Sequence, residues 1–327
     1  MTDSTGLVYV GKIVQVDPIP NAHFIVSATV ICGKGGRWKG VVRKDELSLG
    51  MNCIVYLPDS LIPESDEMRF MESRGWRVKM CRFRGAPSEV LIMPMHSTDT
   101  RAWSIAVGTD VTTEYGVTKY HKPIPLSLQG IAKGEFPQFI PKTDELNYQR
   151  HFDLVEALHG KPYYVTEKAD GSSTTAYRYK GQFGVCSRNY ELEPDDNNGY
   201  WKVASKYQLE AKLPDNIAIQ WETCGPKIQS NPMGLTDLEG FAFSAYNIEE
   251  HRYLVIEEFL ELCENLQFPT VRLLESGSSF DKHIVETLGE GRYRNGNERE
   301  GVVVRSHGNC LGSTPISFKV INLNYEK

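Results

Sequence analysis

Near its middle, this chain carries three charged residues between two apolar, strand-like runs, in the segment Glu167-Lys168-Ala169-Asp170-Gly171. The run Tyr163-Tyr164-Val165 precedes this segment and Thr174-Thr175-Ala176-Tyr177 follows it. Alternate side chains of an extended strand share one face, so we expect Lys168 and Asp170 to project on the same side. The glycine that ends the segment lets the backbone approach a ligand closely. A lysine between two carboxylates is usually a solvated ion pair, so the segment needs support from other parts of the sequence.

The bulk properties limit the possible classes of protein. A chain of 327 residues is longer than one hydrophobic core usually organises, so we expect two domains. The formal net charge of −6 means that any nucleic-acid surface must be local. The seven cysteines are scattered and odd in number, which argues against a disulfide framework or a zinc site and favours a reducing compartment. We expect no signal peptide, no membrane span and no secretion, and hence a cytoplasmic or nuclear protein.

Short apolar segments interrupted by glycine and proline dominate the first part of the chain. They predict strands at residues 7–16, 24–31, 37–42, 53–57 and 90–94. Such short strands suggest a small closed barrel, and their order resembles an OB-like module. Residues 96–125 lose the periodic apolar pattern. We therefore predict an OB-like β-barrel domain over residues 1–120 and a second domain over residues 121–327, which carries the motifs described below.

The second part mixes strands and helices, so the expected fold class is α+β, with antiparallel sheets and helices following the barrel. Strands are predicted at residues 163–168, 174–180, 183–187, 218–222, 241–248, 301–305 and 316–321. Helices are predicted at residues 148–158 and 249–266, the second stopped by Pro269.

Charged residues recur downstream of Lys168 in a fixed order, each within or beside an apolar strand. They are Arg188, Glu222, Glu300 and Lys319. Singly, each has an ordinary explanation, such as a solvated surface arginine or a carboxylate at the end of a strand. A lysine alone in an apolar strand, by contrast, needs an anion or an exit to solvent. A Glu-Gly-Val-Val segment behind a Glu-Lys-x-Asp-Gly segment arises much less easily by chance.

This ordered set resembles the covalent nucleotidyltransferases, the superfamily of polynucleotide ligases and mRNA capping enzymes. There, the lysine of the first motif attacks a nucleotide α-phosphate. The resemblance implies that Lys168 is the catalytic residue, that it attacks ATP and that it forms lysyl-AMP while pyrophosphate leaves. An ammonium group is not nucleophilic at neutral pH, so nearby positive charge would have to lower the pKa of such a lysine.

The resemblance also implies roles for other residues. Arg188 and Lys319 would bind phosphates, and Phe243 would stack on adenine, with Phe241 and Tyr246 as alternatives. The full implied nucleotide-binding set is Glu167, Asp170, Gly171, Arg188, Glu222, Phe243, Glu300 and Lys319. The implied metal set is Asp170, Glu222 and Glu300, for Mg²⁺ or Mn²⁺ held partly through waters.

Two departures from the family pattern stand out. Trp221 occupies the position where glycine is usual before the glutamate. Ligases of this superfamily often carry two lysines in the last strand, whereas this chain has Ser317 or Ile321 in the second place. Another basic residue would then have to supply part of the phosphate binding.

Domain order separates the branches of the superfamily. DNA ligases and capping enzymes place the OB module after the last lysine motif, whereas here the candidate module comes first and only residues 320–327 follow Lys319. This order, with Phe139-Ile140-Pro141-Lys142-Thr143-Asp144-Glu145 ahead of the nucleophile, resembles the Naegleria-type ATP-dependent RNA ligases. The resemblance implies RNA repair by joining a 3′-hydroxyl to a 5′-phosphate end, with ATP and Mg²⁺ or Mn²⁺ as cofactors, RNA as partner, and a monomer.

A short basic stretch of the first part is the candidate nucleic-acid surface. Its members are Arg74, Arg77, Lys79, Arg82 and Arg84, with Arg69 and the aromatic residues Phe70, Trp76 and Phe83. Interleaved basic and aromatic residues suit phosphate contacts and base stacking, although an ordinary hairpin with a solvated face has the same composition. Two alternatives to an RNA ligase stay open, a DNA or dual-specificity ligase and a catalytically silent RNA-binding relative.

Overall fold

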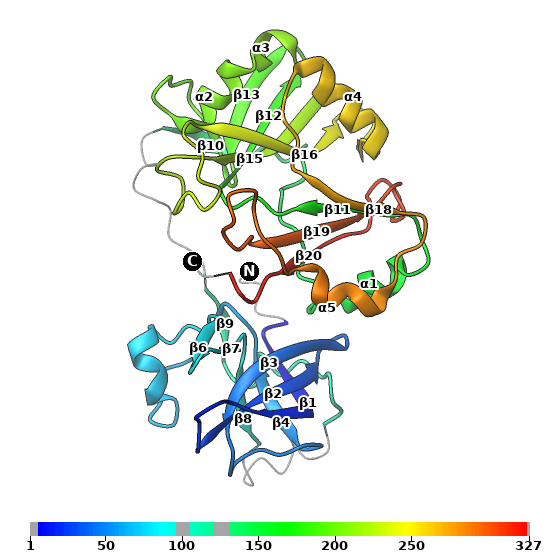
Figure 1. Ribbon diagram of the computed structural model, residues 1–327. Coiled ribbons are helices and arrows are strands. Elements are labelled where there is room, and N and C mark those ends of the chain that lie inside the picture. The colour runs from blue at the N-terminus through cyan, green and yellow to red at the C-terminus, as the bar shows by residue number, and fades with distance from the viewer. Residues whose placement is uncertain (1–5, 96–104, 121–130, 326–327) are drawn as a thin grey trace. The chain divides into compact units, whose positions relative to one another are not determined.

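The structure is a computed structural model that describes residues 6–95, 105–120 and 131–325. The chain divides into two compact units (Figure 1). The first comprises residues 1–123 and 149–153, and the second comprises residues 124–148 and 154–327. Residues 96–104 and 121–130 lie outside the described residues. The predicted domain limit after residue 120 falls beside this second gap and stays a prediction.

A five-stranded antiparallel sheet forms the centre of the first unit, in the order β3-β2-β1-β4-β8. Its strands are β1 (Val8–Pro18), β2 (Ile25–Cys32), β3 (Gly36–Arg43), β4 (Asn52–Tyr56) and β8 (Leu91–Pro94). All five lie within a few residues of the predicted strands. Alternating burial along β3 shows why, because every second side chain enters the core.

This sheet curls so that its outer strands approach each other. The backbone N–H of Glu89 donates to the carbonyl of Lys39 at 2.8 Å, and the N–H of Lys39 donates to the Glu89 carboxylate at 2.9 Å. Gly40 permits the approach, because a Cβ atom there would lie 2.6 Å from Ile92. The expected barrel-like first domain is therefore confirmed.

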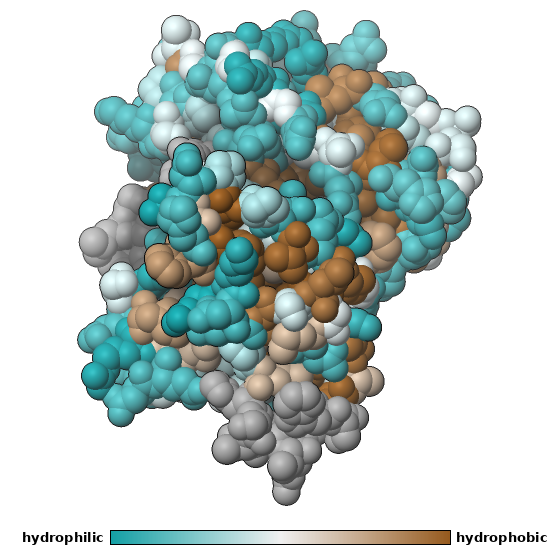
Figure 2. Space-filling view, turned by 60° about the horizontal axis from the view of Figure 1, so that its bottom comes forward, coloured by the Kyte–Doolittle hydropathy of each residue, from teal (hydrophilic) through white to brown (hydrophobic). Residues whose placement is uncertain are grey.

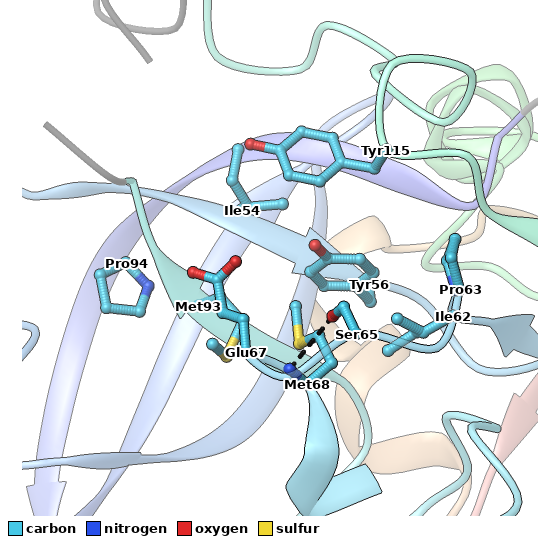
Figure 3. A pocket seen from close by; sticks show the side chains of 10 residues that line it. All are labelled: Ile54, Tyr56, Ile62, Pro63, Ser65, Glu67, Met68, Met93, Pro94 and Tyr115. Atoms are coloured by element: carbon cyan, nitrogen blue, oxygen red, sulfur yellow. Dashed lines mark hydrogen bonds between the residues drawn. The ribbon is translucent and has the colours of Figure 1, made fainter. Parts of the chain in front are cut away.

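Smaller elements complete the first unit. These are β5 (Ser60–Leu61), the 3₁₀ helix η1 (Arg69–Arg74), the hairpin β6 (Cys81–Phe83) and β7 (Ala86–Ser88), and β9 (Thr118–Lys119). Figure 3 shows a pocket of about 200 Å³ beside β4 and β8, bounded on another side by the segment that leads into η1. The rings of Tyr56 and Tyr115 meet edge to face in it, with centroids 5.9 Å apart. At its rim the N–H of Met68 donates to Ser65 Oγ at 3.3 Å.

Two antiparallel sheets build the second unit. The larger has the order β10-β14-β13-β12-β15-β16-β17 and the smaller β18-β11-β19-β20. The strands are β10 (Ala132–Glu135), β11 (Tyr163–Glu167), β12 (Ser172–Tyr179), β13 (Gln182–Ser187), β14 (Tyr190–Leu192), β15 (Ile217–Cys224), β16 (Glu239–Asn247), β17 (Arg252–Tyr253), β18 (Leu273–Gly277), β19 (Gly301–Ser306) and β20 (Ser317–Ile321). The helices are α1 (Phe152–Leu158), α2 (Gly199–Lys206), α3 (Leu209–Lys212), α4 (Ile256–Leu266), η4 (Lys282–Ile284) and α5 (Val285–Leu288). The expected α+β class is confirmed.

The long helix expected at residues 249–266 is shorter than predicted. Residues 252–253 form β17 instead, and α4 begins at Ile256. The Glu258 carboxylate accepts the N–H of Val255 at 3.0 Å and pairs with Arg252 at 2.6 Å, which fixes the start of the helix. The helix expected at residues 148–158 likewise begins only at Phe152.

Helices α2 and α4 cover one face of the larger sheet and share a core with it. Trp221 on β15 is fully buried there, its ring centroid 5.3 Å from that of Phe268 and its Nε1 donating to Thr223 Oγ1 at 2.9 Å. Neighbouring residues of a strand point to opposite faces, so Glu222 projects away from this core. The tryptophan that departs from the family pattern is thus a packing residue beneath the helices.

On the face drawn in Figure 2, hydrophilic residues predominate and hydrophobic residues form smaller groups among them. Within residues 6–95, 105–120 and 131–325, no helix is long and apolar enough to cross a membrane.

Replacing the buried tryptophan should therefore be costly. We expect Trp221→Ala to lower the free energy of unfolding by about 3–5 kcal/mol, because it removes a large buried ring and leaves a cavity. Urea unfolding followed by far-UV circular dichroism measures the change. Leu260→Ala, on α4 and 44% exposed, is the matched control and should change stability little. Equal losses in the two variants would contradict this view of the core.

Candidate active site

The segment Glu167–Gly171, named the nucleophile motif after its expected role, meets the Glu-Gly-Val-Val motif where the paired strands β11 and β19 end. Glu167 lies opposite Val302 in the β11–β19 ladder, so Lys168 emerges beside Glu300. Lys168 Nζ is 2.6 Å from Glu300 Oε2, and the N–H of Lys168 donates to the carbonyl of Gly301 at 3.0 Å. Gly301 has a φ of +148°, and a Cβ there would lie 2.2 Å from the carbonyl oxygen of Val320. Only glycine fits at this point.

A tyrosine that no motif indicated holds these two segments together. Tyr293 is buried, and its hydroxyl donates to the carbonyl of Lys168 at 2.9 Å. The same oxygen accepts the N–H of Glu300 at 3.2 Å. Tyr293 therefore ties the backbone of Lys168 to that of Glu300.

The carboxylates expected around Lys168 come from the segment between β11 and β12, from β15 and from the residue that precedes β19. Asp170 is 3% exposed and accepts a hydrogen bond from the hydroxyl of Tyr325. Glu222 lies opposite Ser173 in the β12–β15 ladder. Burial raises the pKa of the Cys224 thiol, and the negative charges of Glu222 and Asp170 raise it further, so this thiol lies among the acidic groups as a neutral side chain.

Gly171 has a packing role that the sequence did not reveal. A Cβ at this position would lie 2.3 Å from the carbonyl oxygen of Thr223 and 2.8 Å from Cys224 Sγ. The close approach that glycine permits is therefore one between β15 and the end of the nucleophile motif.

The acidic residues do not form a ready-made cage for a metal. Among the residues that the structure describes, no three His, Cys, Asp or Glu side chains are grouped to ligate one ion directly. Asp170, Glu222 and Glu300 nevertheless all act electrostatically on Cys224, so they surround one small region. Such a set suits Mg²⁺, which keeps several waters and uses one or two carboxylates together with substrate phosphates.

Lys319 lies near Lys168. It pairs with Val303 on β19, and its N–H donates to the carbonyl of Leu146 at 2.8 Å. Burial lowers the pKa of Lys319, and the charge of Lys168 lowers it further. Of the two places for a second lysine, Ser317 donates to Glu145 at 2.5 Å and Ile321 lies opposite Gly301.

A buried ion pair occupies the region beyond Lys319. Arg305 is 4% exposed, pairs with Glu145 and lies opposite Ser317 in the ladder. Its Nη1 is buried and has no hydrogen-bond partner among the residues that the structure describes. The guanidinium carbon lies 5.8 Å from the centroid of the Phe243 ring. The sequence analysis gave Arg305 no role.

Arg305 and Phe243 help to line a pocket of about 190 Å³ between the two sheets of the second unit. Gln220, Phe243 and Ser244 come from the larger sheet, and Tyr164, Arg305 and Ser317 from the smaller one.

A β-bulge explains why Phe243 reaches this pocket. Gln220 pairs with Ser244 while its neighbour Trp221 pairs with Ala242, so Phe243 is the extra residue. A bulge of this kind re-aims a side chain. Phe241 and Tyr246 were the alternatives to Phe243 for stacking on adenine. Phe241 packs in a cluster with Ala169 and Val271, and the ring centroid of Tyr246 lies 5.3 Å from that of Tyr253.

Arg188 lies at the rim of this region. Its side chain is 63% exposed and pairs with Asp144 at 2.5 Å. Asp144 also lines the pocket. The structure thus connects Arg188 to the pocket through a carboxylate neighbour.

The predicted basic stretch of the first unit separates into two kinds of residue. Arg77 pairs with Asp59 at 2.6 Å, Arg74 lies over the ring of Phe83, and Arg82 donates to the carbonyl of Gly85. These three arginines therefore support the local fold. Lys79 and Arg84 are exposed.

Glu167 is a buried acid, and within the described part of the chain its Oε2 has no hydrogen-bond partner. Burial raises the pKa of Glu167, and the charges of Arg272, Arg299 and Arg294 partly oppose that shift. The folded protein therefore binds the proton of Glu167 more tightly than the unfolded chain does.

The shift at Glu167 predicts a pH-dependent stability. The pKa of Glu167 is higher in the folded protein than in the unfolded chain. Its stabilising contribution is therefore fully present at a pH below the unfolded pKa, and it is lost as the pH rises through the folded pKa. We expect Glu167→Gln to gain about 1–3 kcal/mol over wild type at pH 8, with the difference vanishing near pH 4. Urea unfolding at a series of pH values measures this. The exposed Glu210→Gln is the control, and parallel pH profiles for wild type and Glu167→Gln would contradict the argument.

Comparisons with known proteins agree with this geometry. An RNA ligase family model matches residues 161–321, and an OB-fold domain model matches residues 7–95. The comparison with curated proteins finds no match.

Solved structures of Naegleria gruberi RNA ligase match nearly the whole chain. An apo form of one variant is 30% identical, with a TM-score of 0.79 over 97% of this chain and 96% of that one. A variant with AMP and Mn is 30% identical, with a TM-score of 0.79 over 97% of each chain. A variant with ATP and Mn is 30% identical, with a TM-score of 0.80 over 97% of each chain. The resemblance inferred from the motif order is confirmed: this chain belongs to the RNA ligase family, in the branch of the Naegleria gruberi enzyme.

Proposed function

We propose that this protein is an ATP-dependent RNA ligase that joins a 3′-hydroxyl to a 5′-phosphate RNA end through a lysyl-AMP intermediate on Lys168. The observation that carries the proposal is the position of Lys168, 2.6 Å from Glu300 and close to Lys319. The similar Naegleria gruberi structures contain ATP or AMP with Mn, which supports ATP and a divalent metal as cofactors here.

In the first step Lys168 Nζ attacks the α-phosphorus of ATP. A P–N bond forms, the bond from the α-phosphorus to the bridging oxygen breaks, and pyrophosphate leaves. The ammonium must lose a proton before it attacks. Glu300 Oε2 is in hydrogen-bond contact with this group and is positioned to receive that proton.

Phosphate binding falls to the cations around Lys168. Lys319 is largely desolvated beside Lys168, and an anion between them would offset both the burial and the mutual repulsion. The exposed fork of Arg188 suits bidentate contact with a phosphate, once it exchanges Asp144 for the ligand.

The pocket lined by Phe243 is the proposed site for the adenine base. Ser317 lies two residues before Lys319 on β20, and Arg305 is the partner of Ser317 in the ladder. Because two residues of a strand span about 7 Å, the part of the pocket at Ser317 and Arg305 lies about that far from Lys319. The base would then stack on Phe243. Gln220 is fixed for base contacts, because its Nε2 donates to the carbonyl of Pro141 at 2.8 Å and its Oε1 accepts from Ser244 at 2.7 Å.

A divalent metal, when bound, supplies charge neutralisation for the ATP phosphates. Asp170, Glu222 and Glu300 are the residues that would hold it, through waters, and Asp170 or Glu222 would alternatively meet a ribose hydroxyl.

Two further transfers complete the proposed reaction. The 5′-phosphate of the RNA attacks the lysyl-AMP phosphorus, so the P–N bond breaks and an RNA-adenylate forms. The RNA 3′-hydroxyl then attacks the activated 5′-phosphorus, forms the phosphodiester bond and releases AMP. We propose a monomer in a reducing compartment, cytoplasmic or nuclear, since all seven cysteines are free thiols.

Covalent labelling tests the proposal. Incubation with α-labelled ATP and Mg²⁺ or Mn²⁺, followed by a denaturing gel, should give a labelled band. Lys168→Ala should reduce the label below detection, because no other group replaces the nucleophile. The exposed Lys202→Ala is the matched control and should label normally, and labelled GTP tests nucleotide choice.

The outcome also separates the alternatives. Sealing of a nick with an RNA 3′-hydroxyl, but not of an all-DNA nick, supports an RNA ligase over a DNA or dual-specificity ligase. RNA binding without any labelled band, from protein free of pre-bound AMP, would overturn the proposal in favour of a silent RNA-binding relative.

The exposed basic residues of the first unit are the proposed RNA contacts. For the double variant Lys79→Ala/Arg84→Ala, we expect weaker RNA binding and a salt dependence of log K shallower by about 1.4, since each contact with single-stranded phosphate contributes about 0.7. Fluorescence anisotropy with a labelled single strand across a salt series measures this slope. The control Lys12→Ala/Lys44→Ala removes two exposed lysines of the same unit. An equal effect in both variants would place the RNA elsewhere.

A further inference from the structure

The chain that follows β20 is anchored beside Glu300 by a buried asparagine. Asn322 is 1% exposed, and its N–H donates to the carbonyl of Glu300 at 2.9 Å. Its Nδ2 donates to the carbonyl of Arg299 at 2.9 Å and to Glu298 Oε2 at 3.1 Å. A side chain with this many partners fixes the direction in which the chain leaves the sheet.

From this anchor a tight turn carries Tyr325 back to the nucleophile motif. Asn322 Oδ1 accepts the N–H of Asn324 at 2.9 Å, and the carbonyl of Asn322 accepts the N–H of Tyr325 at 3.1 Å. An asparagine that bonds the backbone two residues ahead forms such a turn. The hydroxyl of Tyr325 then donates to Asp170 Oδ2 at 2.5 Å.

The bond from Tyr325 restricts the carboxylate that it contacts. Asp170 is buried, and a buried carboxylate needs donors. A hydroxyl-to-carboxylate bond is charge-assisted and among the stronger hydrogen bonds, so it limits rotation of the acid. An ionised carboxylate offers about four acceptor sites, so this bond is compatible with a ligand on the same group.

We propose that Tyr325 is a positioning residue for the reaction, which holds the Asp170 carboxylate in the orientation that receives the ribose hydroxyl or metal-bound water of ATP. This inference rests on the proposed function. Tyr325 acts through Asp170, and Asn322 in turn sets the position of Tyr325.

Tyr325→Phe tests the inference because it removes only the hydroxyl. In single-turnover adenylylation we expect KM for ATP to rise about tenfold, the order expected for one charge-assisted hydrogen bond, with kcat changing less than about twofold. The thermal midpoint should stay near that of wild type. Tyr207→Phe is the matched control, because its hydroxyl also donates to a carboxylate, that of Glu239, and it should leave both constants unchanged.

A double-mutant cycle separates positioning from a purely structural role. In an Asp170→Asn background, Tyr325→Phe should add less than about a twofold effect, because the group through which it acts is already altered. Asn322→Ala should reproduce the rise in KM and, unlike Tyr325→Phe, also lower the thermal midpoint. A Tyr325→Phe enzyme with wild-type KM, or full additivity in the cycle, would overturn the inference.

Equilibrium binding of ATP distinguishes failure of the inference about Tyr325 from failure of the proposed function. Wild-type protein that forms no covalent adduct would sink the ligase proposal, and the dissociation constant for ATP would then still report on Tyr325. A tenfold weaker constant in Tyr325→Phe supports the inference in that case. An unchanged constant, or no ATP binding by wild-type protein, refutes it.

Discussion

The pairing of β11 with β19 is the constraint on which the rest of the site depends. It brings together Lys168 and Glu300, which lie 132 positions apart in the chain. A register slip of one residue would move every side chain of a strand to the opposite face, so the ion pair and the sheet specify each other. Gly301 removes the clash with β20, and Tyr293 bonds to both segments. Lys168, the proposed nucleophile, is therefore held by backbone hydrogen bonds between these segments.

The two faces of the larger sheet have different roles, one in the core and one in the candidate site. Its helix-covered face buries Trp221, whereas the other face offers Gln220 and Glu222. The bulge in β16 adds Phe243 to Ser244 on that second face, which strict alternation would not allow. One local irregularity thus supplies an aromatic wall beside the polar groups, and such a mixture of apolar surface and a few fixed polar groups is typical of a small-molecule site.

Local pattern predicted much of this architecture, and long-range contacts account for what it missed. The strands around Lys168, Glu222 and Glu300 carry runs of β-branched and aromatic residues, and Lys180-Gly181 has the left-handed backbone of a two-residue hairpin turn. The pairing of Arg305 with Glu145, by contrast, joins residues 160 positions apart, and no motif indicates it. The same holds for Tyr293 and Tyr325, whose hydroxyl groups act where distant segments meet. A register shift such as that at Phe243 is likewise a property of two strands and not of one.

Repulsion between two neighbouring lysines is a main feature of the electrostatics of the site. Lys319 lies desolvated near Lys168, and like charges in a low-dielectric region disfavour each other. Glu300 offsets part of that repulsion by pairing with Lys168. A polyphosphate bound between the two lysines would add a second counter-charge beside that of Glu300. On the proposed mechanism, the carboxylate of Glu300 keeps its contact with Lys168 Nζ and accepts the proton that the lysine has to lose. On the proposed mechanism, the same short contact that pairs Lys168 with Glu300 therefore also places the proton acceptor against the attacking amine.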